Sequence, residues 1–200
     1  MKVIGITGGV GAGKSAVLEI LRSLLRCRIL IADEAAHEAE AKGQPCYDEL
    51  IEILGSGIIG EDGEIDRKKM AAKIFEDGND EVLKKVNAIV HPRVKEYILR
   101  LIDESKKEGK YDWFFIEAAL LIEDGYKAIC DELWYVYAPE NVRAARLKES
   151  RGYSDEKIKA VMESQNDDET FRENCDRVII NDGDLNKTRE NIENMLKTID

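Results

Sequence analysis

Several features of secreted and membrane proteins are missing from this sequence. No apolar stretch is long enough for a secretory signal, and none approaches the length of a membrane span. The four cysteines, Cys27, Cys46, Cys130 and Cys175, form no C-x-x-C pair, and a chain of 200 residues can bury a core without disulfides. We therefore expect a cytoplasmic protein with reduced, mostly buried thiols.

Proline is also scarce, and positive charge is outweighed by negative charge. There are 41 acidic and 30 basic residues, so the formal charge is −11, and a field of this sign repels nucleic acid and anionic membrane surfaces. There are only three prolines, and the chain has no Pro-rich linker, internal repeat or low-complexity segment. We expect no nucleic-acid or membrane partner and infer no obligate protein partner. Any phosphate-bearing ligand would need a locally basic pocket.

Five short apolar runs have the composition of buried parallel strands, and most are followed by helix-patterned sequence. They are Val3 to Ile6, Arg28 to Ala32, Trp113 to Ile116, Leu133 to Tyr137, and Val178 to Ile180. Strands that alternate with helices predict a doubly wound α/β sheet, whose ligands bind beyond the carboxyl ends of the strands. Active-site residues should therefore follow strands.

Two long segments interrupt this alternation. About 80 residues separate the second and third strand runs, far more than the roughly ten to fifteen that one crossover helix needs. We interpret them as a helical acceptor subdomain, with turns expected at Gly55 to Gly63 and Asp77 to Asp80. Its expected helices are Tyr47 to Leu54, Arg67 to Glu76, Glu81 to Val90, and Arg93 to Lys107. A second excursion, from Pro139 to about Thr170, is rich in basic residues and is a candidate lid.

These segments predict one domain of residues 1–200. Its core comprises residues 1–34, 110–142 and 172–200, the acceptor subdomain residues 35–109, and the lid residues 143–171.

The segment from Gly8 to Ser15 matches G-x-x-x-x-G-K-[ST], the Walker A loop, and lies between an expected strand and an expected helix. Glycines let such a P-loop wrap a phosphate with its backbone N–H groups, and the helix N-terminus adds partial positive charge. Lys14 is expected to reach the β and γ phosphates of ATP, and Ser15 to ligate Mg²⁺. The alternative is a plain helix-opening turn. The residues expected to bind the nucleotide are Gly8, Gly11, Ala12, Gly13, Lys14, Ser15 and Ala16.

A P-loop alone does not separate kinases from GTPases or mechanical ATPases. A GTPase should contain N-K-x-D, and the closest string, Asn186 to Arg189, lacks the aspartate. No ABC-type signature is present, and the chain leaves little room for the coupling domains of a motor. An inserted acceptor subdomain and an arginine-bearing lid are typical of small-molecule kinases.

Two acidic residues come at the ends of expected strands. Asp33 follows the second strand, where a carboxylate could accept the proton of an acceptor hydroxyl during phosphoryl transfer. Alternatively, it is the N-cap of a helix that begins at Glu34. Glu117 ends the third strand, where a Walker B acid would hold Mg²⁺, and its alternative is a solvated carboxylate.

Three arginines of the candidate lid, Arg143, Arg146 and Arg151, could neutralise charge on the transferred phosphoryl group. The alternative is an exposed, charged helix.

The two histidines, His37 and His91, are too far apart in sequence to suggest a metal site. We expect each to be structural or close to a ligand. The His91-Pro92 pair predicts a helix break in the acceptor subdomain.

Several ordered motifs make the chain resemble the dephospho-CoA kinase family along nearly its whole length. They are Ile4 to Ser15, Ala32 to Glu34 with His37, Asp62 to Arg67, Val90 to Pro92, Leu120-Leu121 with Glu123, Arg146-Leu147 with Arg151, Gln165, and Val178 to Asn181 before Gly183. The resemblance implies a P-loop NTPase-like core with a five-stranded parallel sheet flanked by helices, a helical domain for the CoA moiety, and a lid. It also implies transfer of the γ-phosphate of ATP to the ribose 3′-hydroxyl of dephospho-CoA, the last step of coenzyme A synthesis.

The resemblance also implies roles for single residues. Asp33 is the implied catalytic base, and Arg151 is implied to act with Lys14 in catalysis. The implied nucleotide contacts outside the P-loop are Arg146 and Asn181. The implied acceptor contacts are His37, Arg67, His91 and Leu120.

The chain departs from the family pattern at two places. Ile31-Ala32-Asp33 stands where the family has Asp-x-Asp, so one acid is missing. Residues 117–123 replace the usual Asp-x-Pro-Leu-Leu-Phe-Glu and lack its proline and phenylalanine. A related nucleoside or nucleotide kinase with another acceptor is therefore an alternative function. A nucleotide-binding regulator without turnover is another, although retention of Lys14, Ser15 and Asp33 argues against it.

Overall fold

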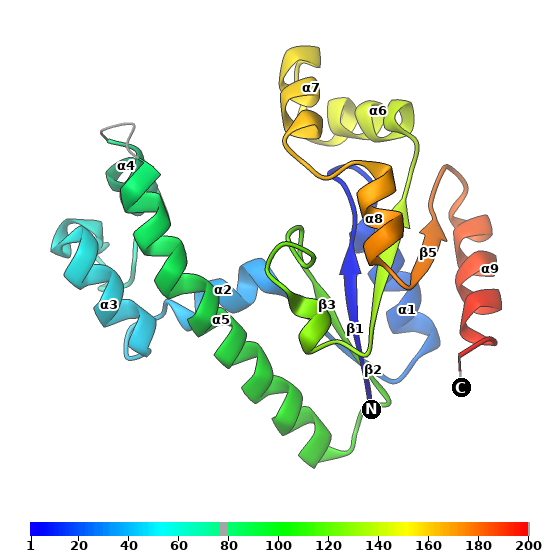
Figure 1. Ribbon diagram of the computed structural model, residues 1–200, viewed down its shortest axis with the longest axis horizontal. Coiled ribbons are helices and arrows are strands. Elements are labelled where there is room, and N and C mark those ends of the chain that lie inside the picture. The colour runs from blue at the N-terminus through cyan, green and yellow to red at the C-terminus, as the bar shows by residue number, and fades with distance from the viewer. Residues whose placement is uncertain (77–79, 200) are drawn as a thin grey trace. The chain divides into compact units, whose positions relative to one another are not determined.

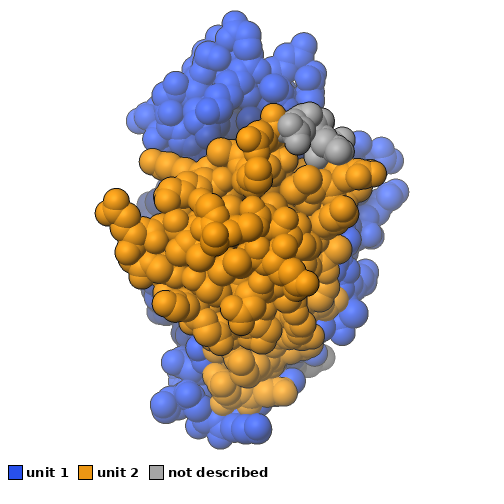
Figure 2. Space-filling view, turned by 90° about the vertical axis from the view of Figure 1, so that its left-hand side faces the viewer, with its two compact units in different colours: residues 1–30, 105–200 blue, residues 31–104 orange. Residues whose placement is uncertain are grey.

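The chain forms two compact units, which Figure 2 shows in different colours. The structure is a computed structural model and describes residues 1–76 and 80–199. Unit 1 comprises Met1–Leu30 and Ser105–Asp200, and unit 2 comprises Ile31–Glu104. No helix of the described residues combines the length and the apolar composition that crossing a bilayer requires.

A five-stranded parallel sheet forms the centre of the fold, which confirms the predicted fold class (Figure 1). Its strands are β1 (Lys2–Thr7), β2 (Cys27–Ile31), β3 (Trp113–Glu117), β4 (Glu132–Tyr137) and β5 (Arg177–Ile180). The strand order is β2-β3-β1-β4-β5. The register pairs Ile6 with Glu117 and Thr7 with Tyr135, so β1, β3 and β4 end at the same edge. The segments that follow these strands therefore start close together.

Helices cover the sheet because each has an apolar side. In α1 (Lys14–Leu24), Val17, Leu18 and Leu21 are buried, and this helix packs against α9 (Leu185–Leu196). Figure 1 shows α8 (Asp168–Asn174) in front of β4, where Phe171 stacks on Tyr135 with ring centroids 4.7 Å apart. The remaining helices of unit 1 are α6 (Glu140–Arg151), α7 (Asp155–Glu163) and the 3₁₀ turn η2 (Tyr126–Ala128).

Unit 2 is helical and has a core of its own. Its elements are α2 (Ala32–Ala39), α3 (Pro45–Leu54), the 3₁₀ turn η1 (Ser56–Ile58), α4 (Arg67–Phe75) and most of α5 (Asp80–Glu108). The core contains Cys46, Tyr47, Leu50, Leu54, Ile58, Ile65, Ile74 and Val86. In the segment between α3 and α4, Gly55 and Gly63 both have φ near +80°. An antiparallel bridge joins Ile59 to Ile65 in the same segment. The other expected turn, Asp77 to Asp80, falls at residues 77–79, outside the described part of the chain.

The expected helix break at His91-Pro92 is wrong. One helix, α5, continues through Pro92. Proline removes one backbone hydrogen bond from a helix, but burial of the next turns can offset that cost. Here Val94 and Ile98 are buried at 6% and 0% exposure.

The boundary between β2 and α2 also differs from the prediction. Ala32 is the first residue of α2 instead of the last of a strand, and Ile31 is the N-cap. Asp33 therefore lies in the first helical turn and does not cap a helix that begins at Glu34. The apolar run before it does not mark the boundary, because alanine is compatible with a strand and is also the best helix former.

The four cysteines are free thiols, but only Cys46 is fully buried. Cys27, Cys130 and Cys175 are partly exposed, although most of each residue is buried. Burial, followed by the nearby carboxylates of Glu40 and Glu49, raises the pKa of Cys46 to about 11. This thiol is therefore protonated at neutral pH.

An ion pair ties β4 to β5 at the start of both strands. Arg177 donates to both carboxylate oxygens of Glu132, at 2.6 and 3.2 Å, and the indole N–H of Trp134 donates to the same carboxylate at 2.7 Å. The hydrogen bond from Arg177 is the main cause that lowers the pKa of Glu132. Because the folded state lowers this pKa, the pair stabilises the fold above the unfolded-state pKa of glutamate and loses its effect as the pH falls through the folded-state value.

We predict that Glu132→Gln lowers the free energy of unfolding at pH 7 by about 1–3 kcal/mol, because charge-assisted hydrogen bonds are lost. The difference in the free energy of unfolding between the variant and the wild type should shrink when the pH falls from 7 to 4, because Glu132 becomes protonated. Urea unfolding at pH 7, 5.5 and 4 measures both. Glu193→Gln is the control, since Glu193 and Arg189 form an exposed pair at 3.5 Å. An equal effect of the two substitutions at every pH would contradict this prediction.

Candidate active site

The P-loop, residues 8–15, connects β1 to α1 and depends on glycine at particular positions. Gly8 has a φ of 146°, and a Cβ atom there would lie 2.5 Å from the carbonyl oxygen of Val136. Gly13, the N-cap of α1, has a φ of 87°, and a Cβ atom there would overlap Nδ2 of Asn181. Only glycine therefore fits the close approach of β4 and of the segment after β5.

The carbonyl groups of the P-loop are all paired within the protein. Each carbonyl oxygen from Gly8 to Gly13 accepts a hydrogen bond from within the fold. The donors are Lys14 Nζ to Gly8 (2.9 Å), Ala12 N to Gly9 (3.1 Å), Arg143 Nε to Val10 (2.9 Å), Arg146 Nη1 to Gly11 (3.4 Å) and Ala12 (3.2 Å), Asn181 Nδ2 to Ala12 (2.8 Å), and Val17 N to Gly13 (3.2 Å). The carbonyl oxygens of the loop are therefore satisfied, whereas several of its N–H groups are not.

Several N–H groups of the loop and first helical turn have no acceptor among the residues that the structure describes. They include those of Gly11, Gly13, Lys14, Ser15 and Ala16. Unpaired N–H groups in a loop that leads into a helix N-terminus form an anion site, because their partial positive charges converge. The geometry is that of a phosphate cradle.

Lys14 and Glu117 form an ion pair beside the cradle. The Nζ atom of Lys14 lies 3.4 Å from Oε1 of Glu117, and both side chains are less than one-fifth exposed. Glu117 is the last residue of β3, as predicted. The ammonium group is therefore already fixed near the position where a bound phosphate chain would lie.

Ser15 and Glu117 have the oxygen atoms that Mg²⁺ prefers. Ser15 is exposed in the first turn of α1, and its hydroxyl is free of protein partners in the described part of the chain. No group of three metal-ligating side chains occurs among the described residues. In general, Mg²⁺ needs few protein oxygens, because it keeps several waters and binds substrate phosphates.

The structure brings two more of the predicted residues to the P-loop. Arg146 and Asn181 both donate to its carbonyl oxygens, and Thr188 in turn donates to Oδ1 of Asn181 at 3.1 Å. Their position is on the outer side of the loop, so in this structure both support it from behind. Direct contact of either residue with the nucleotide stays a prediction.

Two other predicted residues of unit 1 do not touch the P-loop. Arg151 is exposed at the end of α6, and its guanidinium carbon lies 5.9 Å from the ring centre of Tyr153. Leu120 is 50% exposed in the turn after β3. The predicted roles of Arg151 in catalysis and of Leu120 in acceptor binding both need contacts with a ligand. Both side chains are exposed, so these roles stay predictions.

The remaining predicted residues, Asp33, His37, Arg67 and His91, belong to unit 2. Asp33 and His37 are exposed on α2, and His91 is exposed in the middle of α5. Arg67 is the first residue of α4, because Asp66 caps that helix by accepting from the N–H groups of Lys68 and Lys69.

Arg67 is paired with an acid that sequence reasoning missed. Its Nη2 donates to Oε2 of Glu40 at 2.9 Å, and Glu40 is only 5% exposed. Glu40 and His37 line the same cavity of about 150 Å³. Nothing in the sequence distinguishes Glu40 from the other charged residues of this segment, because its importance comes from burial.

Comparisons with known proteins cover nearly the whole chain. The family model described as dephospho-CoA kinase matches residues 2–187. The chain is 36% identical to a dephospho-CoA kinase of Carboxydothermus hydrogenoformans over 98% of its own length and 94% of that protein. It is also 36% identical to one of Corynebacterium glutamicum, with both chains fully covered.

The solved structures agree. The structure of a dephospho-CoA kinase from Campylobacter jejuni matches with a TM-score of 0.73 and 26% identity, covering 98% of this chain and 96% of that one. A shikimate kinase from Bacteroides thetaiotaomicron matches with a TM-score of 0.56 at 11% identity, which shows the shared fold alone. From the match over residues 2–187 and the full-length relatives, we conclude that the chain belongs to the dephospho-CoA kinase family.

Proposed function

We propose that this enzyme transfers the γ-phosphate of ATP to the ribose 3′-hydroxyl of dephospho-CoA, giving coenzyme A and ADP. One observation carries the proposal: the family match spans residues 2–187 and so includes the P-loop and all of unit 2. Both substrates are charged metabolites, and a cytoplasmic enzyme would meet them.

In the proposed reaction, the 3′-hydroxyl oxygen forms a bond to the γ-phosphorus while the bond to the β,γ-bridging oxygen breaks. The hydroxyl proton passes to a base, and ADP leaves with the electrons of the broken bond. The free N–H groups of Gly11, Gly13, Lys14 and Ser15 would bind the phosphate chain, and Lys14 would neutralise charge on the β and γ phosphates. Arg151 would add positive charge from α6.

We propose Ser15 and Glu117 as the protein ligands of Mg²⁺, the second held directly or through water. When bound, the ion supplies charge neutralisation at the phosphates. Glu117 also orients Lys14, because the two side chains are already paired.

We propose that unit 2 binds the acceptor. Arg67 and His37 lie near one cavity, where Glu40 fixes the guanidinium of Arg67. Together with His91 and Leu120 they would contact dephospho-CoA, and the carboxylate of Asp33 would take the hydroxyl proton.

An ADP-release assay tests the proposed function. We expect ADP with dephospho-CoA and Mg²⁺, and far less with adenosine, AMP or pantetheine phosphate. EDTA should abolish transfer, because the metal neutralises the phosphates. Faster turnover with adenosine or AMP would favour the alternative of a nucleoside or nucleotide kinase. ATP binding without turnover of any acceptor would favour a nucleotide-binding regulator.

We predict that Lys14→Ala lowers kcat/KM by about a hundred-fold or more, since it removes the charge that balances the developing phosphate charge. The melting temperature should change little by comparison. Lys110→Ala is a matched control, because Lys110 also pairs with a glutamate at 3.4 Å but lies near the amino end of β3. Near-normal turnover of Lys14→Ala would remove the P-loop from the mechanism.

We predict that Asp33→Asn lowers kcat by about a hundred-fold, the lower end of the range for general-base help, because a loose transition state needs little activation of the hydroxyl. The affinity for ATP should stay within about two-fold.

Glu34→Gln is the matched control for Asp33. Both acids are exposed in the first turn of α2, where each interacts favourably with the helix dipole. Both substitutions should therefore cause the same small loss of thermal stability, and only Asp33→Asn should lose activity. A wild-type kcat in Asp33→Asn would rule out its role as the base.

A further inference from the structure

Two side chains hold Val10, at the tip of the P-loop, from segments far away in the sequence. The N–H group of Val10 donates to Oε1 of Gln165 at 2.8 Å, and its carbonyl oxygen accepts from Nε of Arg143 at 2.9 Å. Arg143 belongs to α6, and Gln165 lies between α7 and α8. Both polar groups of one residue are thus fixed from outside the loop.

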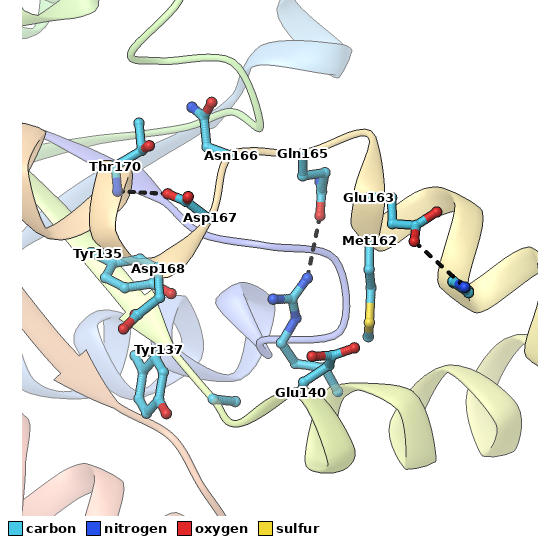
Figure 3. A pocket seen from close by; sticks show the side chains of 13 residues that line it. Tyr135, Tyr137, Glu140, Met162, Glu163, Gln165, Asn166, Asp167, Asp168 and Thr170 are labelled. Carbon is cyan, nitrogen blue, oxygen red and sulfur yellow. Dashed lines mark hydrogen bonds and ion pairs between the residues drawn. The ribbon is translucent and has the colours of Figure 1, made fainter.

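A third contact closes this arrangement, which we call the Val10 bracket (Val10, Arg143 and Gln165). Nη2 of Arg143 lies 3.4 Å from Oε1 of Gln165, the interaction drawn as a dashed line from Gln165 in Figure 3. The guanidinium group also lies against Gly9, where a Cβ atom would overlap it. The bracket therefore fixes the position of Arg143 as well as that of the loop.

Arg143 and Gln165 also line a cavity of about 820 Å³ between β4, α6, α7 and α8 (Figure 3). Elsewhere on the cavity wall, the polar groups of Tyr135, Asp167 and Asp168 make hydrogen bonds within the protein. Asp167 caps α8, and burial followed by a hydrogen bond to Asp168 raises the pKa of Tyr135. Arg143 and Gln165 are thus the residues of the cavity lining that bind the P-loop.

The bracket determines which N–H groups of the loop are free for a phosphate. The N–H of Val10 is directed to Gln165, whereas those of Gly11, Gly13, Lys14 and Ser15 have no acceptor in the described residues. A loop with glycine at four of its eight positions has many accessible conformations, so its orientation needs support from neighbouring side chains. A peptide rotation at Val10 would redirect the N–H groups that follow it.

We propose that Gln165 is a positioning residue for ATP: with Arg143, it holds Val10 so that the following N–H groups converge on the phosphate chain. This inference rests on the proposed function in one respect, because it assumes that ATP is bound by the P-loop. It assigns Arg143 to the outer side of the loop and not to the transferred phosphoryl group.

Two substitutions at Gln165 test the proposal. Gln165→Leu keeps the size and removes the acceptor, whereas Gln165→Glu keeps an acceptor oxygen for both Val10 and Arg143. We expect KM for ATP to rise about five- to ten-fold in Gln165→Leu, as for the loss of one hydrogen bond, with kcat and KM for dephospho-CoA within about two-fold. Gln165→Glu should stay within about two-fold of the wild type in all three.

A matched control is Asn166→Leu. Asn166 is the neighbouring amide and lines the same cavity, but its Nδ2 donates to Glu123 at 2.7 Å and not to the P-loop. This variant should retain the wild-type KM for ATP.

Hydrogen exchange of the Val10 amide, measured by NMR without ligands, gives a readout that does not need turnover. The amide should exchange faster in Gln165→Leu and at the wild-type rate in Gln165→Glu and Asn166→Leu. ATP affinity by calorimetry should follow the same order. These two measurements test the bracket even if dephospho-CoA is not the acceptor.

Unchanged ATP affinity and unchanged Val10 exchange in Gln165→Leu would overturn the proposal. So would equal defects in Gln165→Leu and Gln165→Glu, because the acceptor oxygen would then not matter. A lower kcat and a lower melting temperature, with unchanged Val10 exchange, would show that Gln165 has a general structural role instead.

Discussion

A phosphate cradle made of backbone N–H groups requires that the carbonyl groups of the same peptides point elsewhere. In this protein every carbonyl oxygen from Gly8 to Gly13 either points elsewhere or is neutralised, because each accepts a hydrogen bond from the protein. The donors come from α6, from the end of β5, from α1 and from the loop itself. An unpaired carbonyl oxygen near a phosphate would repel it, so these contacts are as necessary for binding as the free N–H groups.

This constraint explains why the segments around the P-loop carry arginine and asparagine. Arg143 and Arg146 lie against the outer side of the loop, where a guanidinium group can donate to two carbonyl oxygens at once. Asn181 is buried and is itself fixed by Thr188. The result is a local concentration of positive groups in a chain whose formal charge is −11. The electrostatic field at the loop therefore favours phosphate although the field of the whole protein does not.

In unit 2, a guanidinium group is likewise fixed by a hydrogen-bonding partner. Arg67 is held by Glu40, whose carboxylate is almost fully buried. Breaking such a pair leaves a buried charge without compensation, so the two residues are structurally interdependent. A guanidinium with one nitrogen fixed in this way is held in an orientation that the free side chain would not keep.

The sequence by itself determined the order of the strands along the chain, the P-loop and the class of reaction. These follow from local patterns: apolar runs of strand length, the spacing of Gly8, Gly13, Lys14 and Ser15, and the ordered family motifs. Local patterns were insufficient where packing competes with intrinsic preference, as at Ala32 and at Pro92, which lies inside one continuous helix. The tertiary structure decided which charged residues are buried and which backbone group each side chain reaches. Glu40, Gln165 and the outward position of Arg143 became visible only there. A hydrogen bond such as that between Val10 and Gln165, 155 positions apart, depends on how the chain folds and not on the spacing of its residues.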